Sequence, residues 1–194
     1  MRISDENQLE RDFQQLCERL RDPDVLNPVH GAPVFYFVFP PQQSLKIRRY
    51  LPGWIAQLKN KYDLDVETIS LSEILWDLID ESGRWEEWLD FEEDFDIDEI
   101  NESIRSVLRN NNAMIEHVTE KAIAFSKGTI VFIVDVDLLH PYFRTRSIEN
   151  YMMSQVDNPV VFFYPGRRSG QHGLHFLEFY PEDPGYRSTL IGGL

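Results

Sequence analysis

The sequence predicts an α/β fold, a three-layer domain built on a mainly parallel sheet. Strand-like and helix-like segments alternate along the chain, which is typical of this class. Two of the strand-like segments, Val34–Phe39 and Thr129–Val134, are apolar throughout rather than alternating. Such strands are normally covered on both faces, as in a parallel sheet. A length of 194 residues suits one core, so we expect a single domain over 1–194.

The first 22 residues predict an N-terminal helix. Ser4 can cap it, and apolar side chains then recur every three or four residues, at Leu9, Phe13, Leu16, Cys17 and Leu20. Cys17 lies on this stripe, which favours a buried core residue over a reactive thiol. A single cysteine also excludes an intrachain disulfide and suggests a reducing compartment, so we predict a cytoplasmic protein.

The middle of the chain predicts further helices with recognisable ends. A helix follows the first strand, with a kink expected at Pro52, and 66–69 forms a short strand. Ser70 with Glu73, and Asp96 with Glu99, have the spacing of capping boxes at helix starts. The run 110–112, three asparagines, should divide the later helical stretch in two, with the second helix ending at Gly128.

The last third predicts two strands and one helix. Residues 159–164 are continuously apolar and read as a third buried strand, with a helix at 147–155 before it. Residues 173–180 form a possible last strand ahead of a turn-rich segment.

The charge balance excludes several functions. Lys and Arg total 19 against 33 Asp and Glu, a formal net charge of −14. A chain this acidic is repelled by polyphosphate at long range, so we expect contact with nucleic acid only as part of a complex. The longest uninterrupted apolar stretch, Val34–Phe39, is far short of a membrane span, and we expect no membrane partner.

The loop after the first strand argues against nucleotide hydrolysis. A phosphate-binding loop at this place needs glycines, whose backbone N–H groups close on the anion. Residues 40–46 contain no glycine, and Pro40 and Pro41 have no N–H to donate. The position therefore suits a P-loop while its chemistry is absent, and we expect no cofactor and no small-molecule substrate.

Two acids follow the second apolar strand and could hold a metal ion. Asp135 and Asp137 are two residues apart, so in extended chain their carboxylates point to one face. A divalent ion there would support phosphoryl transfer or nuclease activity. The structural alternative is that both acids end the strand in solvent or cap a turn.

Arginines near the strand ends are candidates for anion binding. Arg167 and Arg168 lie between glycines after the third strand, where they could clamp a phosphate or carboxylate. A solvated loop is the alternative interpretation. Arg144, Arg146 and Arg187 complete the set of candidates. His172 and His175 point to opposite faces of a strand, so zinc is not expected.

Residues 84–99 form an acidic, aromatic segment. Nine acids and no base lie between Glu86 and Glu99, and large apolar residues are interleaved with them. The predicted partner-binding residues are Trp85, Trp88, Phe91, Glu92, Glu93, Asp94, Phe95 and Asp96. In one hypothesis the aromatic residues anchor a partner and the acids steer a basic surface. In the other, the segment is an amphipathic helix that packs on its own domain.

Several segments between about Val34 and Leu190 occur in a recognisable order. They are Phe35–Leu58, Ile69–Trp76, His140–Arg144, Asn150, Pro159–Gly166, Gly170–Gln171 and Tyr186–Arg187. In this order the chain resembles the BrxB family of bacteriophage-exclusion (BREX) defence systems.

The resemblance implies a P-loop-NTPase-like fold without nucleotide-binding residues. It also implies a part in a multi-protein phage-defence assembly, with the PglZ-like, ATPase and methyltransferase components as partners and the PglZ-like component foremost. No catalytic residue is transferred by it. The sequence therefore favours a non-catalytic scaffold, with a metal-dependent enzyme using Asp135 and Asp137 as the alternative.

Overall fold

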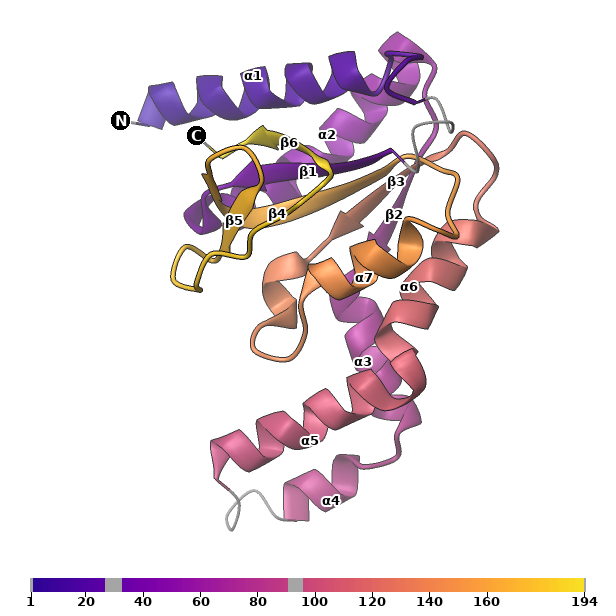
Figure 1. Cartoon of the computed structure of the whole chain (residues 1–194), viewed down its shortest axis with the longest axis vertical. Helices are drawn as coiled ribbons and strands as arrows, with labels where there is room; N and C mark the ends of the chain where they lie inside the picture. Colours follow the sequence, from indigo (N-terminus) through magenta and orange to yellow (C-terminus); the bar gives the residue numbers. More distant parts are fainter. Residues whose placement is uncertain (1, 27–32, 91–95, 194) are drawn as a thin grey trace.

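A six-stranded sheet forms the centre of the computed structural model, which describes residues 2–26, 33–90 and 96–193 (Figure 1). Five strands follow the order β2-β3-β4-β1-β6, and each neighbouring pair is parallel. The short β5 pairs antiparallel with the end of β4. The strands are β1 (Val34–Phe39), β2 (Val66–Ser70), β3 (Ile130–Val134), β4 (Val160–Ser169), β5 (Gly173–Phe176) and β6 (Thr189–Gly192). The predicted α/β class with a mainly parallel sheet is confirmed.

Helices cover both faces of the sheet, which makes three layers. They are α1 (Arg2–Arg19), α2 (Ser44–Tyr62), α3 (Leu71–Glu81), α4 (Trp85–Asp90), α5 (Ile97–Arg109), α6 (Ala113–Ala124) and α7 (Thr145–Met152). Phe35 and Phe37 of β1 pack with α1 and α2, whereas Tyr36 and Val38 pack with α3, α6 and α7. All six residues of β1 are buried, which explains why its sequence is apolar throughout.

Aromatic stacking joins α1 to α2 and both to the sheet. Phe13 of α1 stacks on Trp54 of α2 with ring centroids 4.3 Å apart, and Trp54 meets Phe37 edge-on at 5.5 Å. Cys17 lies in the same cluster and is buried, as predicted. Pro52 lies inside α2, which runs on to Tyr62 as one helix.

Three predicted helix boundaries are confirmed by their caps. The Ser70 hydroxyl accepts the backbone N–H of Glu73 at 3.3 Å and begins α3. Asp96 and Glu99 form a capping box at the start of α5. Asn111 has a φ of 50°, a left-handed conformation that asparagine tolerates, and the chain breaks there between α5 and α6.

Other predicted boundaries are wrong. The first helix begins at Arg2, so Ser4 is inside it rather than at its cap. α6 ends at Ala124 because Phe125 is extended, and Gly128 instead lies in the turn before β3. The helix predicted at 147–155 is α7, displaced to Thr145–Met152.

The last strands also differ from the prediction. β4 continues past Tyr164 through the two arginines that were expected in a loop, because it pairs there with β5. Gly166 permits this pairing, since a Cβ at that position would lie 2.2 Å from the carbonyl oxygen of His175. The predicted strand 173–180 ends at Phe176, and β6 was not predicted.

Candidate interaction surface

The acidic, aromatic segment lies at one end of the molecule. Figure 1 shows α4 and α5 at the opposite end from α1, beyond the edge of the sheet. The segment comprises α4 and the start of α5. Five of its predicted partner-binding residues lie outside the described residues, namely Phe91, Glu92, Glu93, Asp94 and Phe95.

Trp88 packs inside the chain. Its side chain is 6% exposed, and its indole Nε1 donates a hydrogen bond to the hydroxyl of Ser103 at 2.9 Å. The Arg84 guanidinium lies 5.6 Å from the centre of the Trp88 ring. These contacts pack α4 against α5. The Trp88 side chain therefore stabilises the fold and is not exposed to a partner.

Trp85 is placed differently, on an exposed apolar patch. We define the arm patch as Trp76, Trp85 and Leu89, which are 51%, 45% and 62% exposed. The rings of Trp76 and Trp85 are 5.9 Å apart, and Leu89 follows Trp85 by four residues on the same face of α4. Two tryptophans in contact on a surface form the kind of apolar anchor that protein interfaces use.

Acids are sequence neighbours of the arm patch on α4. Arg84 donates from Nε and Nη2 to the two carboxylate oxygens of Glu87, each at 2.9 Å, and these hydrogen bonds lower the pKa of that carboxyl. Glu86, Asp90 and Asp98 are exposed and form no ion pair within the described ranges. Their charge is therefore directed at solvent and is free to attract a basic surface.

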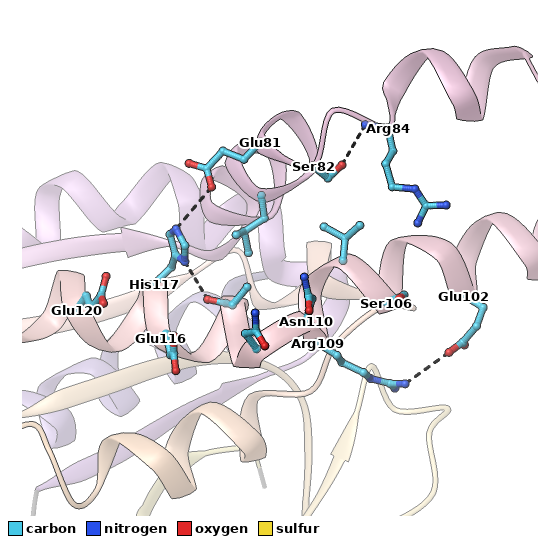
Figure 2. Close-up of a pocket in the computed structure, with 14 residues that line it drawn as sticks. Glu81, Ser82, Arg84, Glu102, Ser106, Arg109, Asn110, Glu116, His117 and Glu120 are labelled. Atoms are coloured by element: carbon cyan, nitrogen blue, oxygen red, sulfur yellow. Dashed lines mark hydrogen bonds and ion pairs between the residues drawn. The ribbon is translucent and has the colours of Figure 1, made fainter.

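A groove of about 800 Å³ lies between α3, α5 and α6 (Figure 2). The His117 ring contacts the carbonyl oxygen of Ala113 at 2.9 Å and the Glu81 carboxylate at 3.8 Å. The charged residues that line the groove are Glu81, Glu102, Glu116, Glu120, Arg84, Arg109 and His117. Four carboxylates against two arginines make the groove acidic, like the helix beside it.

At the carboxyl edge of the sheet, Asp135 and Asp137 meet an arginine. Arg48 Nε contacts Asp135 Oδ1 and Arg48 Nη2 contacts Asp137 Oδ1, each at 2.9 Å. The Ser70 hydroxyl donates to Asp135 Oδ2 at 2.6 Å. The two acids converge on a guanidinium that joins α2 to the chain after β3. They do so without the extended chain that was expected, since Asp135 has a φ of 61° and Asp137 lies in a short 3-10 helix, Val136–Leu139. Within the described residues no group of three or more His, Cys, Asp or Glu could hold a metal ion.

The five candidate arginines do not form one site. Arg167 and Arg168 are successive residues of β4, so their side chains point to opposite faces and cannot clamp one anion. Arg168 Nη1 donates to the carbonyl oxygen of Leu190 at 3.4 Å. Arg146 is paired with Asp183, and Arg187 lines a pocket beside Arg146. The remaining one, Arg144, stacks on aromatic rings.

The two histidines are also accounted for by the fold. The His172 ring contacts the carbonyl oxygen of Tyr186 at 3.0 Å, and the His175 ring contacts that of Tyr180 at 3.1 Å. Each imidazole thereby holds part of the turn-rich segment after β5.

A buried polar network was missed in the sequence. Glu149 of α7 is 3% exposed and accepts hydrogen bonds from Tyr36 at 2.9 Å and from Ser188. Burial raises the pKa of Glu149. Tyr36 is 113 residues away in the chain, so no local spacing could reveal the pair. The one available sign was a tyrosine in an otherwise apolar strand.

Comparison with known proteins gives one consistent result. The model of the family described as "BREX protein BrxB" matches residues 67–191. A Bacillus cereus (strain H3081.97) protein described as "BREX protein BrxB" is 27% identical over 161 residues, which cover 81% of this chain and 82% of that protein. No solved structure matches the chain. Across the described part, no helix is long and apolar enough to cross a membrane.

Proposed function

The chain belongs to the BrxB family, and from this premise we propose that it is a non-catalytic scaffold in a BREX phage-defence complex. A BREX protein has the other proteins of its system as partners. The proposed scaffold works in the cytoplasm by holding such partners through direct protein–protein contacts.

The arm patch is the observation that carries this proposal. Trp76 and Trp85 are half-exposed and touch each other. Glu86 and Asp90, on the same short helix as Trp85, are exposed and form no ion pair with any described residue. Aromatic anchors within a charged rim are characteristic of protein interfaces. The matching partner surface has an apolar pocket and a rim of lysine and arginine.

The resemblance favours the PglZ-like component as the partner, ahead of the ATPase and the methyltransferase. We also retain a P-loop-like topology as part of the proposal. The prolines after β1 stand where a nucleotide-binding loop would, and Pro40 begins a short 3-10 helix, η2 (Pro41–Gln43), that contains no glycine.

The alternative function, a divalent-metal phosphoryl-transfer enzyme or nuclease, would use Asp135 and Asp137. The Arg48 guanidinium supplies the positive charge that such an ion would bring, at 2.9 Å from both carboxylates. This contact favours a structural role for the two acids.

A binding measurement with purified components tests the scaffold. The double variant Trp76→Ala and Trp85→Ala removes the exposed anchors and should fold, since neither ring is in the core. By isothermal titration against the PglZ-like protein we expect affinity to fall about tenfold or more. Leu45→Ala is the matched control, because Leu45 is 68% exposed on α2 and lies outside the arm patch. Equal affinity of the double variant and the control would overturn the proposed surface.

Charge neutralisation tests the acidic rim separately. Glu86→Gln with Asp90→Asn should slow association at low salt and have a smaller effect at high salt, because exposed charges are screened. Rates that do not depend on salt would contradict steering by these acids.

A further inference from the structure

A small pocket on this acidic protein is lined by arginines. A pocket of about 160 Å³ opens between α5 and the start of α7. The lining residues are Arg109, Pro141, Tyr142, Phe143, Arg144 and Ser147. Two of them are arginines and none is an acid. Arg109 also lines the acidic groove between α3, α5 and α6, so the positive lining is confined to this small pocket of a chain with a net charge of −14.

Arg144 is held in place without a carboxylate. Its guanidinium carbon lies 3.4 Å from the centre of the Tyr180 ring and 5.0 Å from that of Phe176. It forms no ion pair within the described ranges, although it also lines a second pocket, which contains Glu182 and Asp183. A guanidinium that stacks on a ring keeps its N–H groups directed sideways, where they can donate to phosphate oxygens.

Arg109 provides the second charge from another helix. It contacts Glu102 at 3.6 Å, and both side chains are 61% exposed, which is the weak, solvent-screened kind of ion pair. A second observation supports a positive potential here. Burial, and after it Arg144 and Arg105, lower the pKa of His140, which lies beside Tyr180.

An exposed aromatic surface adjoins the arginines. Phe179 is 66% exposed, and its ring centroid lies 4.6 Å from that of Tyr180 and 5.4 Å from that of His140. Tyr180 is the ring on which Arg144 stacks. An exposed aromatic ring next to guanidinium groups is the combination with which proteins bind unstacked bases.

We propose that this face binds single-stranded nucleic acid, with a phosphate in the arginine pocket and a base stacked on Phe179. The aromatic surface favours this ligand over a phosphorylated peptide, which would use the arginines alone. The net charge opposes binding at long range, so affinity is local, modest and strongly salt-dependent. This site goes beyond the proposed scaffold function and does not use the arm patch.

Fluorescence anisotropy with the full chain tests the proposal. The probes are labelled single strands of twelve thymidines as DNA, twelve uridines as RNA, and an abasic strand of equal length, at 50 and 200 mM salt. We expect the base-containing strands to bind more tightly than the abasic strand, with affinity falling steeply as salt rises. Arg144→Ala should weaken binding about tenfold, and Arg109→Ala several-fold, while Arg187→Ala, an exposed arginine in another pocket, is the control.

Phe179→Ala separates the ligand classes. It should lower affinity for the thymidine strand about fivefold or more and leave the abasic strand nearly unchanged. The exposed Phe179 and Arg109 can be changed without entering the core, so these variants stay informative if Arg144→Ala unfolds. Absence of binding at 50 mM salt would overturn the proposal, as would equal affinity of Phe179→Ala and wild type. Tighter binding of a phosphoserine peptide than of either strand would also overturn it.

Discussion

Tyr36 donates its hydroxyl to Glu149 across 2.9 Å, and both residues are buried between β1 and α7. The second carboxylate oxygen of Glu149 accepts the Ser188 hydroxyl. A buried carboxylate is costly unless its oxygens are hydrogen-bonded. The network therefore fixes α7 and the chain before β6 to β1, at one register.

We expect the stability of this network to depend on pH. Burial raises the pKa of Glu149 above its ordinary 4.5, so between 4.5 and that raised pKa the folded protein holds a proton that the unfolded chain releases. The free energy of unfolding contributed by Glu149 is thus fully present below pH 4.5 and is lost as the pH rises through the folded pKa. Each unit of pKa increase corresponds to about 1.4 kcal/mol.

Urea unfolding of wild type and Glu149→Gln between pH 4 and 8 measures this effect. The glutamine does not titrate, so the difference between the two proteins isolates the carboxyl. Wild type should lose stability relative to the variant as the pH rises. A difference that is constant, or that grows in favour of wild type, contradicts a raised pKa.

Trp88 and Trp85 should respond differently to truncation. Trp88→Ala leaves a cavity where α4 packs on α5 and removes the hydrogen bond to Ser103. We therefore expect the free energy of unfolding to fall by about 3–5 kcal/mol. Trp85→Ala changes an exposed ring and should cost less than about 1 kcal/mol. Thermal unfolding compares them, and similar losses would show that the two rings contribute alike to the fold.

The sequence could predict those features that depend on residues close together in the chain. Ser70 and Glu73 lie within one helical turn, and the apolar run of β1 reports its own burial, so both were found. β6 was missed because four residues that end in glycine become a strand only beside β1. The arginine that neutralises Asp135 is 87 residues away, and such a pair is visible only after the sheet has formed.

Cys17 should resist modification in the folded protein. The thiol is buried, and burial raises its pKa to about 11, so little thiolate exists at pH 8. In the native protein we expect a disulfide reagent to modify Cys17 no faster than the protein unfolds. In denaturant the exposed thiol should react within seconds. Full labelling of the native protein within seconds would show that the helix α1 opens readily.

Arg48 should be replaceable by a divalent cation. Arg48→Ala leaves Asp135 and Asp137 close together without their shared counter-charge, and we expect a loss of about 1–3 kcal/mol, or several degrees in Tm. Two carboxylates and the Ser70 hydroxyl are oxygen ligands of the type that Mg²⁺ and Ca²⁺ accept. Millimolar cation should therefore raise the Tm of this variant, and a chelator should reverse the rise. At 100 times the dissociation constant the gain is about 2.7 kcal/mol.

The neighbouring exposed Arg49 provides the control for this experiment. Arg49→Ala makes the same change of net charge on α2 without touching the two acids, so its Tm should stay near that of wild type and should not respond to cation. If wild type gains as much stability from Mg²⁺ as Arg48→Ala does, the guanidinium does not occupy the place of a metal. The alternative enzyme function through Asp135 and Asp137 would then regain support.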